Sequence, residues 1–291
     1  MLRRIRLLIA ALLVATAAHA TDGRFEQGLL WEISRPGVAP SYLFGTMHVA
    51  DPRVLALPSA VEEAFAAART VVLEIRPDDA VARRFSESGR LGRTERLSQL
   101  VPPATFERLV EHLAEHDVGR DVADRLKPWA ALLISTEHPD KGSESLDVTL
   151  YRRARAEHKR IEELESADEK IAAFDSLPRD TQVALLQRAL DHHLAQGKAT
   201  EEAIGVYLRG DLAALEALAW RNGGAVRGHP SHYALFEKRV VRDRSVAMAR
   251  RLQPHLQCGA AFAAVGALHL HGEFGMLKLL QDEGWQIRPV R

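Results

Sequence analysis

Two stretches with the same spacing stand near opposite ends of this 291-residue chain and contain residue types that can do chemistry. Gly45–His48 and Gly266–His269 each run glycine, two further residues, histidine. A neutral histidine ring can bind a metal ion or accept a proton, and glycine lets the backbone turn sharply or approach a ligand closely. Each motif follows a short apolar run. The spacing therefore predicts two imidazoles at the ends of two strands.

Two acids occupy comparable positions. Glu74 stands near the end of a β-branched run, and Glu165 follows the run Arg160–Leu164. Imidazoles and carboxylates together can hold a divalent metal ion that lowers the pKa of a bound water and polarises a carbonyl group. Without a metal ion, a histidine beside a carboxylate can still act as a general base. His48, Glu74, Glu165 and His269 are therefore the candidate residues for metal-assisted hydrolysis.

The elements that would position these residues alternate between strands and helices. Strands are predicted at residues 29–33, 42–44, 70–75, 160–164, 261–265 and 285–290. Val61, Ala64, Phe65 and Ala68 repeat at helical spacing between the second and third strands, so these two strands should be parallel. The carboxyl ends of parallel strands lie at one edge of a sheet, where functional groups gather. We expect the four candidate residues to share that edge.

The whole chain is expected to be an α/β protein. Its mostly parallel sheet would be built from both chain ends, with a large central helical insertion at about residues 78–255. Residues 21–291 would then form a single α/β domain. The turn-forming stretch Arg35–Ser41 predicts a hairpin between the first two strands.

The first twenty residues predict a secretory signal peptide. A basic start is followed by the uncharged apolar run Leu7–Ala18 and by the small-residue cleavage pattern Ala18–Ala20. The apolar run is shorter than the roughly 20 residues that span a bilayer, and no later run is long enough either. The single cysteine, Cys258, excludes an intrachain disulfide. The expected location is the bacterial periplasm.

Composition and motifs narrow the expected partners. The formal net charge is zero, and basic and acidic residues are interspersed along the chain. This distribution, together with the lack of zinc-finger spacing, argues against a nucleic-acid partner. The chain has no P-loop, no dinucleotide-binding glycine motif and no serine in a nucleophile-elbow context. The expected partner is a peptide or small-molecule substrate, and no membrane span is expected.

One competing motif lies in the middle of the chain. His112–His116 reads H-x-x-E-H, a pattern found in zinc proteases, and both histidines fall on a predicted helix at residues 104–116. Phe106, Leu109 and Leu113 form the apolar face of that helix. We interpret the histidines as a solvated polar flank of the helix rather than as a catalytic zinc site.

An ordered series of short stretches resembles the TraB/GumN family. The series comprises Leu30–Ile33, Tyr42–His48, Asp51–Pro52, Val72–Glu74, Lys127–Trp129, Leu146–Asp147, Glu163–Ser166, Phe174–Pro178, Arg242–Arg244 and Val265–Glu273. It covers nearly the whole chain after the predicted signal peptide. The family resembles the TIKI metalloproteases and, more remotely, the ChaN haem-binding and erythromycin-esterase proteins.

This resemblance implies an α/β core with paired GxxH motifs and acidic partners at the active edge. By similarity to TIKI, the chemistry would be metal-dependent peptide hydrolysis, with Mn, Co or Zn as the divalent ion. His48 and His269 would bind the metal, and Glu74 and Glu165 would act as ligand or general base. Arg242 would contact the substrate or the intermediate.

Two interpretations of function stay open. The first is a periplasmic metal-dependent hydrolase, acting on peptides. The alternative is a non-catalytic protein on the same fold that binds haem or a peptide with the same histidines. His271 follows the second motif by two residues, which leaves open whether His269 or His271 faces the site.

Overall fold

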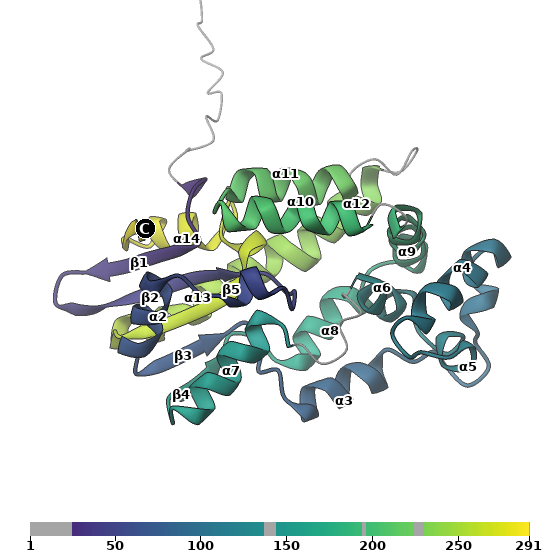
Figure 1. Cartoon of the computed structure of the whole chain (residues 1–291), viewed down its shortest axis with the longest axis horizontal. Helices are drawn as coiled ribbons and strands as arrows, with labels where there is room; N and C mark the ends of the chain where they lie inside the picture. The colour runs from purple at the N-terminus through teal and green to yellow at the C-terminus, as the bar shows by residue number, and fades with distance from the viewer. Residues whose placement is uncertain (1–24, 137–143, 194–195, 224–229, 291) are drawn as a thin grey trace, which may run out of the picture.

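The computed structural model describes residues 25–136, 144–193, 196–223 and 230–290, so the predicted signal peptide lies outside the described residues. The strands are β1 (Leu30–Arg35), β2 (Val38–Thr46), β3 (Thr70–Leu73), β4 (Arg160–Glu163), β5 (Ala261–Gly266) and β6 (Gln286–Val290). They form one six-stranded sheet in the order β4-β3-β5-β2-β1-β6. Figure 1 shows this sheet at one end of the long axis of the molecule and a group of helices at the other.

Helices cover the sheet and extend beyond it. The α-helices are α1 (Pro52–Leu55), α2 (Ser59–Ala67), α3 (Asp79–Ser88), α4 (Pro103–Ala114), α5 (Arg120–Ala123), α6 (Pro128–Thr136), α7 (Leu146–Ala156), α8 (Ala167–Asp175), α9 (Arg179–His193), α10 (Gln196–Leu208), α11 (Leu212–Gly223), α12 (Pro230–Phe236), α13 (Asp243–Cys258) and α14 (Met276–Asp282). Shorter elements are the 3₁₀ helices η2 (Leu97–Gln99) and η4 (Ala267–His269) and the π-helix η3 (Glu237–Arg242). No helix within the described ranges is long and apolar enough to cross a membrane.

The sheet is mixed. β5 runs parallel to both of its neighbours, β2 and β3, and β4 runs parallel to β3. β1 is antiparallel to both β2 and β6. The prediction of an α/β fold is confirmed, but that of a mostly parallel sheet is not exact, because β1 makes the sheet mixed. The reason is the tight turn at Pro36 and Gly37, which reverses the chain between β1 and β2, because parallel neighbours need a long crossover connection.

The strands that carry the candidate residues end at the same edge. Thr46 at the end of β2 is the register partner of Gly266 at the end of β5. Backbone pairing continues just past β3 and β4. The N–H of Glu74 donates to the carbonyl of Ala264 at 3.1 Å, and the N–H of Glu165 donates to the carbonyl of Glu74 at 3.1 Å. The backbone therefore fixes the two glutamates next to each other.

The centre of the sheet is buried on both faces. All residues from Ala261 to Val265 in β5 are buried, as expected for a parallel strand covered by helices on both sides. The ring of Phe65, in α2, packs edge-on against Phe262 with ring centroids 5.4 Å apart. Helices α7 and α13 pack against β3. The candidate residues thus follow strands of a sheet that is closely packed by helices on both faces.

The central helices form a second hydrophobic cluster, separate from the one around the sheet. Leu109 in α4, Trp129 in α6, Phe174 in α8 and Leu186 in α9 belong to it. The predicted helical insertion is nevertheless not a separate layer. Strand β4 joins the sheet from within it, and α7 and α13 contribute buried residues to the sheet cluster. This part of the chain therefore contributes to both hydrophobic clusters.

Candidate active site

A buried cluster of charged side chains lies at the edge where β3 and β4 end. Arg244, in the first turn of α13, donates from Nε to Oε2 of Glu165 at 2.9 Å. Its Nη2 donates to Oε1 of Glu165 and, at 2.5 Å, to Oε1 of Glu74. The Arg244 and Glu165 side chains are buried, and that of Glu74 is 12% exposed. One guanidinium group therefore bridges both carboxylates.

Glu74 has two further partners. Nζ of Lys170, in α8, donates to Oε1 of Glu74 at 2.7 Å. The N–H of Gly266 donates to Oε2 at 3.1 Å. Buried charges are tolerated when they are paired and hydrogen-bonded. In this cluster two carboxylates face two cationic side chains, so the formal charges balance.

Burial and neighbouring charges shift the pKa values of Glu74 and Glu165 in opposite directions. Burial raises the pKa of Glu74, but attraction to Lys170 and Arg244 outweighs burial and holds this pKa well below its usual range. Burial raises the pKa of Glu165 above its ordinary value despite the hydrogen bonds from Arg244. Glu74 is therefore the carboxylate that the surroundings fix most firmly in its ionised form.

His269 faces this cluster with a defined ring orientation. Its Nδ1 lies 2.8 Å from Oγ of Ser245, and that hydroxyl donates its proton to the carbonyl of Val241 at 2.9 Å. The His269 Nδ1–H must therefore be the donor to Oγ. Nε2 lies 3.4 Å from Nη1 of Arg244 and 4.0 Å from Oε2 of Glu74. Because a guanidinium group only donates, Nε2 carries the lone pair.

The same surroundings keep the imidazole neutral. Burial, helped by the positive charges of Arg244 and Lys170, lowers the pKa of His269 from 6.5 to about 4 against the opposing effect of Glu74. A neutral imidazole whose other N–H is hydrogen-bonded is the form that binds a metal ion or accepts a proton. His269 thus combines the chemistry predicted from its motif with a fixed direction for the reactive nitrogen.

The histidine of the first motif has a different environment. The side chain of His48 is 65% exposed, and its Nδ1 lies 3.1 Å from Oδ2 of Asp147, in the first turn of α7. Oδ1 of Asp147 accepts a hydrogen bond from the Thr46 hydroxyl at 2.7 Å. The first motif is therefore tied to α7 and the second to α13. The two motifs leave the sheet from neighbouring strands, at the register pair Thr46 and Gly266.

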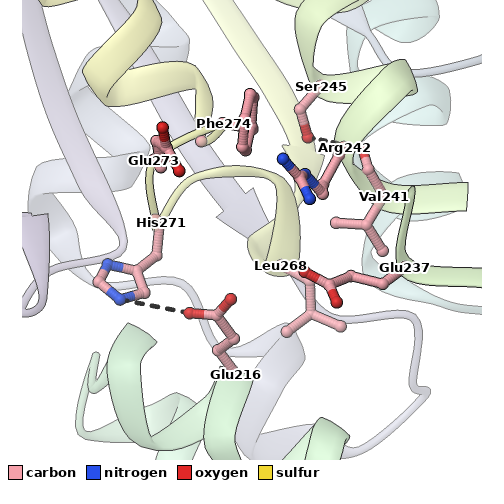
Figure 2. Close-up of a pocket in the computed structure, with 11 residues that line it drawn as sticks. Glu216, Glu237, Val241, Arg242, Ser245, Leu268, His271, Glu273 and Phe274 are labelled. Carbon is pink, nitrogen blue, oxygen red and sulfur yellow. Dashed lines mark hydrogen bonds and ion pairs between the residues drawn. The ribbon is translucent and has the colours of Figure 1, made fainter. Parts of the chain in front are cut away.

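Arg242 lies beside the charged cluster, at a cavity of about 170 Å³. Hydrogen bonds from residue i to i+5 in the π-helix η3 align residues five apart, so Glu237 and Arg242 both line this cavity. The guanidinium of Arg242 stacks on the ring of Phe274 at 3.7 Å from its centroid (Figure 2). Ser245, the partner of His269, lines the same cavity. The cavity is therefore next to His269.

His271 also lines this cavity. Its Nε2 lies 3.3 Å from Oε2 of Glu216 in α11 (Figure 2). The chain does not stay extended between His269 and His271, because Leu270 between them has the helical backbone angles φ −83° and ψ −46°. The two side chains consequently face different surroundings. His269 faces the charged cluster, and His271 faces Glu216 at the cavity.

The structure gathers Glu74, Glu165 and His269 into one cluster and holds His48 separately, at the end of the neighbouring strand. In the part of the chain that the structure describes, no three histidine, cysteine, aspartate or glutamate side chains are grouped so that they could hold a metal ion. The position between the two carboxylates is taken by Arg244. The ligand and catalytic roles assigned from the sequence stay predictions.

Four further residues that sequence patterns did not single out complete the site: Arg244, Lys170, Ser245 and Asp147. The sequence did contain a helical pattern that includes Arg244. Arg244 precedes the buried residues Met248 and Leu252 by four and eight positions, so all three lie on one face of α13. Asp147 and Arg244 also fall within the stretches that resemble the family.

The glycines of the two motifs are not equivalent. A Cβ atom on Gly45 would lie 2.6 Å from Cδ1 of Leu270 and 3.2 Å from the backbone of Ala267. On Gly266 its nearest neighbour would be Oε2 of Glu74, at 3.5 Å. We expect Gly45→Ala to lower the free energy of unfolding by about 1–3 kcal/mol, because the neighbours must move, and Gly266→Ala to have a smaller effect. Urea denaturation of both variants measures this, and equal losses would contradict it.

The competing H-x-x-E-H motif begins in the last turn of α4, which ends at Ala114, so Glu115 and His116 lie past the end of the helix. The interpretation of its first histidine as a solvated residue was wrong: His112 is 3% exposed, and its Nε2 lies 3.0 Å from the carbonyl of Ser135. The rings of His112 and His116 meet edge-on with centroids 5.3 Å apart. These contacts explain His112 as a packed residue of the helical cluster.

Replacing His112 by alanine should leave metal content and hydrolytic activity unchanged. The variant should instead lose about 2–4 kcal/mol of unfolding free energy, because a buried ring and a hydrogen bond are removed. Metal analysis and activity assays at a temperature where the variant is folded separate the two effects. Loss of bound metal in the folded variant would place the metal site on α4 instead.

The chain is similar in sequence to one protein family and to several known proteins. The model of the TraB/PrgY/gumN family matches residues 29–289. The chain is 26% identical to Metalloprotease TIKI2 of Danio rerio, over 89% of this chain and 60% of that protein. It is 23% identical to Uncharacterized protein YbaP of Shigella flexneri, over 86% of this chain and 91% of that protein. No solved structure matches the chain.

The chain spans only part of its animal relatives, 60% of the length of TIKI2 and 62% of that of Metalloprotease TIKI1 of Danio rerio. The match to the family model, in contrast, runs from the residue before β1 into β6 and includes both GxxH motifs and the charged cluster. This protein therefore belongs to the TraB/PrgY/gumN family.

Proposed function

We propose that this protein is a metal-dependent hydrolase of peptides that acts in the periplasm, with its centre at the edge of the sheet beside His269. The observation that carries the proposal is the geometry of His269, a neutral buried imidazole whose Nε2 lies 3.4 Å from Nη1 of Arg244 and 4.0 Å from Oε2 of Glu74. The similarity to proteins named metalloproteases supports the reaction class. The predicted signal peptide supports the location.

The donor atoms only partly fit a metal ion. Nε2 of His269 and Oε2 of Glu74 face each other at 4.0 Å, so these are the two residues that would hold an ion here. Glu165 is held in a two-point pair with Arg244, and His48 with Asp147, so neither is arranged with this pair around a common point. We assign the ion to His269 and Glu74. When bound, it would supply an activated water and polarise the scissile carbonyl.

In this proposal two further residues bind the substrate and orient the imidazole of His269. The cavity beside Ser245 is of a size to receive one side chain or chain end of a peptide. Arg242 stands at that cavity with its guanidinium held flat on Phe274, and a guanidinium group can donate two hydrogen bonds to a carboxylate or carbonyl group. In this proposal Arg242 contacts the substrate, and Ser245 keeps Nε2 of His269 directed at the reacting groups.

Metal analysis of the purified mature chain tests the assignment. Wild type should contain about one equivalent of a divalent ion, Mn, Co or Zn, and His269→Ala should lose it. His48→Ala should retain most of it, because His48 is exposed and paired with Asp147. A protein that takes up none of these ions and hydrolyses no member of a peptide library would overturn the proposal. A haem absorption band that depends on His269 would then favour a binding protein.

A further inference from the structure

We propose that the cavity beside Ser245 is a specificity pocket for a basic side chain, that of a lysine or arginine residue of the substrate. The inference rests on the proposed function and deepens it, because it names the class of peptide that the hydrolase would take. The binding step itself depends only on the side chains that line the cavity, so it can be measured apart from hydrolysis.

The first observation is where the cavity lies. Ser245, in the first turn of α13, lines it, and Oγ of Ser245 is 2.8 Å from Nδ1 of His269. The other lining residues come from α11, from η3 and from the segment between η4 and α14 (Figure 2). A side chain seated in this cavity would therefore hold its peptide next to His269.

The second observation is the charge of the lining. Three carboxylates, those of Glu216, Glu237 and Glu273, stand against the single guanidinium of Arg242. Glu216 lies beside the His271 imidazole, but within the described ranges neither Glu237 nor Glu273 forms an ion pair. A carboxylate in a partly enclosed site favours a cation as its partner. The cavity thus has an excess of negative charge that a cationic ligand would balance.

The third observation is the apolar part of the lining. Val241, Leu268 and Phe274 contribute hydrophobic surface to a cavity of about 170 Å³. Lysine and arginine side chains combine an aliphatic stem with a charged head, so the stem can lie on apolar surface while the head meets a carboxylate. Arg242 is held flat on Phe274, where it can donate to a carbonyl of the peptide backbone (Figure 2).

Other side chains fit this lining less well. An acidic side chain would meet three carboxylates and only one guanidinium. An uncharged apolar side chain of the same length would take water away from Glu237 and Glu273 without giving them a partner, which costs free energy. The combination of apolar walls and excess carboxylates therefore selects a basic side chain.

Titration of the mature chain with three capped amino acids, followed by nuclear magnetic resonance, tests the inference. The probes are the N-acetyl, N-methylamide forms of lysine, norleucine and glutamate, which share one backbone and differ in the side-chain head. Wild type should bind the lysine probe at least about tenfold more tightly than the norleucine probe, and the glutamate probe least tightly. Glu237→Gln and Glu273→Gln should each lower the preference for lysine to about threefold or less.

Glu283→Gln is the matched control. It removes the same charge from an exposed position just after α14, outside the cavity, so the preference for lysine should equal that of wild type. Glu237 is half-buried and Glu273 is exposed, so both glutamine variants should fold, and circular dichroism melts check this.

The outcomes separate the pocket from the proposed function. Equal binding of the lysine and norleucine probes by wild type overturns the pocket. A preference that stays unchanged in both folded glutamine variants overturns it as well. Hydrolysis of norleucine-containing peptides as fast as of their lysine counterparts overturns the pocket while the hydrolase stands. A protein that prefers the lysine probe but hydrolyses no lysine-containing peptide overturns the proposed function while the pocket stands.

Discussion

Replacing Glu74 by glutamine should reduce peptide hydrolysis at least about 100-fold while leaving the protein folded. Glutamine keeps the shape of the side chain and an acceptor for the Gly266 N–H, but it removes the charge that faces His269. Arg244 stays paired with Glu165, so the loss of unfolding free energy should stay near 1–3 kcal/mol. Steady-state kinetics on a cleaved peptide, with a urea titration alongside, measure both quantities.

Glu163→Gln is the control for this variant. Glu163 ends β4, the strand beside β3, and its Oε2 accepts a hydrogen bond from the Arg76 N–H at 3.3 Å, outside the charged cluster. Its activity should stay within about twofold of wild type. If both variants retained activity, Glu74 would have no catalytic role. If both lost it, the effect would come from the sheet edge in general and not from Glu74.

The wild-type protein should lose about 3 kcal/mol of unfolding free energy between pH 7 and pH 4 through His269 alone. Burial lowers the pKa of this imidazole from 6.5 to about 4 in the folded chain. Below pH 6.5 the unfolded chain takes up a proton at this position and the folded chain does not, so acid favours unfolding. The contribution is fully present above pH 6.5 and is lost as the pH falls through about 4.

His269→Asn should remove this part of the pH dependence. Urea denaturation at several pH values, in chelator so that no metal ion contributes, gives the slope for each variant. His48→Asn is the comparison from the other motif, because its side chain is 65% exposed and lies outside the buried cluster. An unchanged slope in His269→Asn would mean that the ring is protonated as readily in the folded chain as in the unfolded chain.

The shared edge could be predicted from the sequence because it depends on local patterns. The runs before Gly45 and Gly266 are short and apolar, and that before Glu74 is β-branched, so each predicts a strand that ends where a functional residue begins. The strand before Glu165 was also predicted correctly. The antiparallel pairing of β1 with β2 follows from the predicted hairpin, but the pairing of β1 with β6 was missed, because it joins strands from opposite ends of the chain.

Sequence patterns only partly predict which of Arg242 and Arg244 reaches the sheet edge. Two residues two apart on a helix face nearly opposite sides, so only one of these arginines can reach the sheet. The spacing from Arg244 to Met248 and Leu252 marks the buried one. The π-helix that turns Arg242 toward the cavity beside Phe274 has no such signal, because π-helices depend on tertiary contacts.

The same limit applies to His269 and His271. Alternation would place both side chains on one side of an extended chain. The 3₁₀ turn η4 instead separates them, one toward Glu74 and the other toward Glu216. The bond between His269 and Ser245 joins residues 24 positions apart, so no local pattern could have predicted it.

Peptide hydrolysis by the chelator-treated mature chain, before and after a divalent ion is restored, tests the central claim most directly. The account predicts that hydrolysis disappears in chelator and returns with Mn²⁺, Co²⁺ or Zn²⁺ in wild type but not in Glu74→Gln. Hydrolysis that continues at the same rate in chelator, or that no metal ion restores, would contradict it.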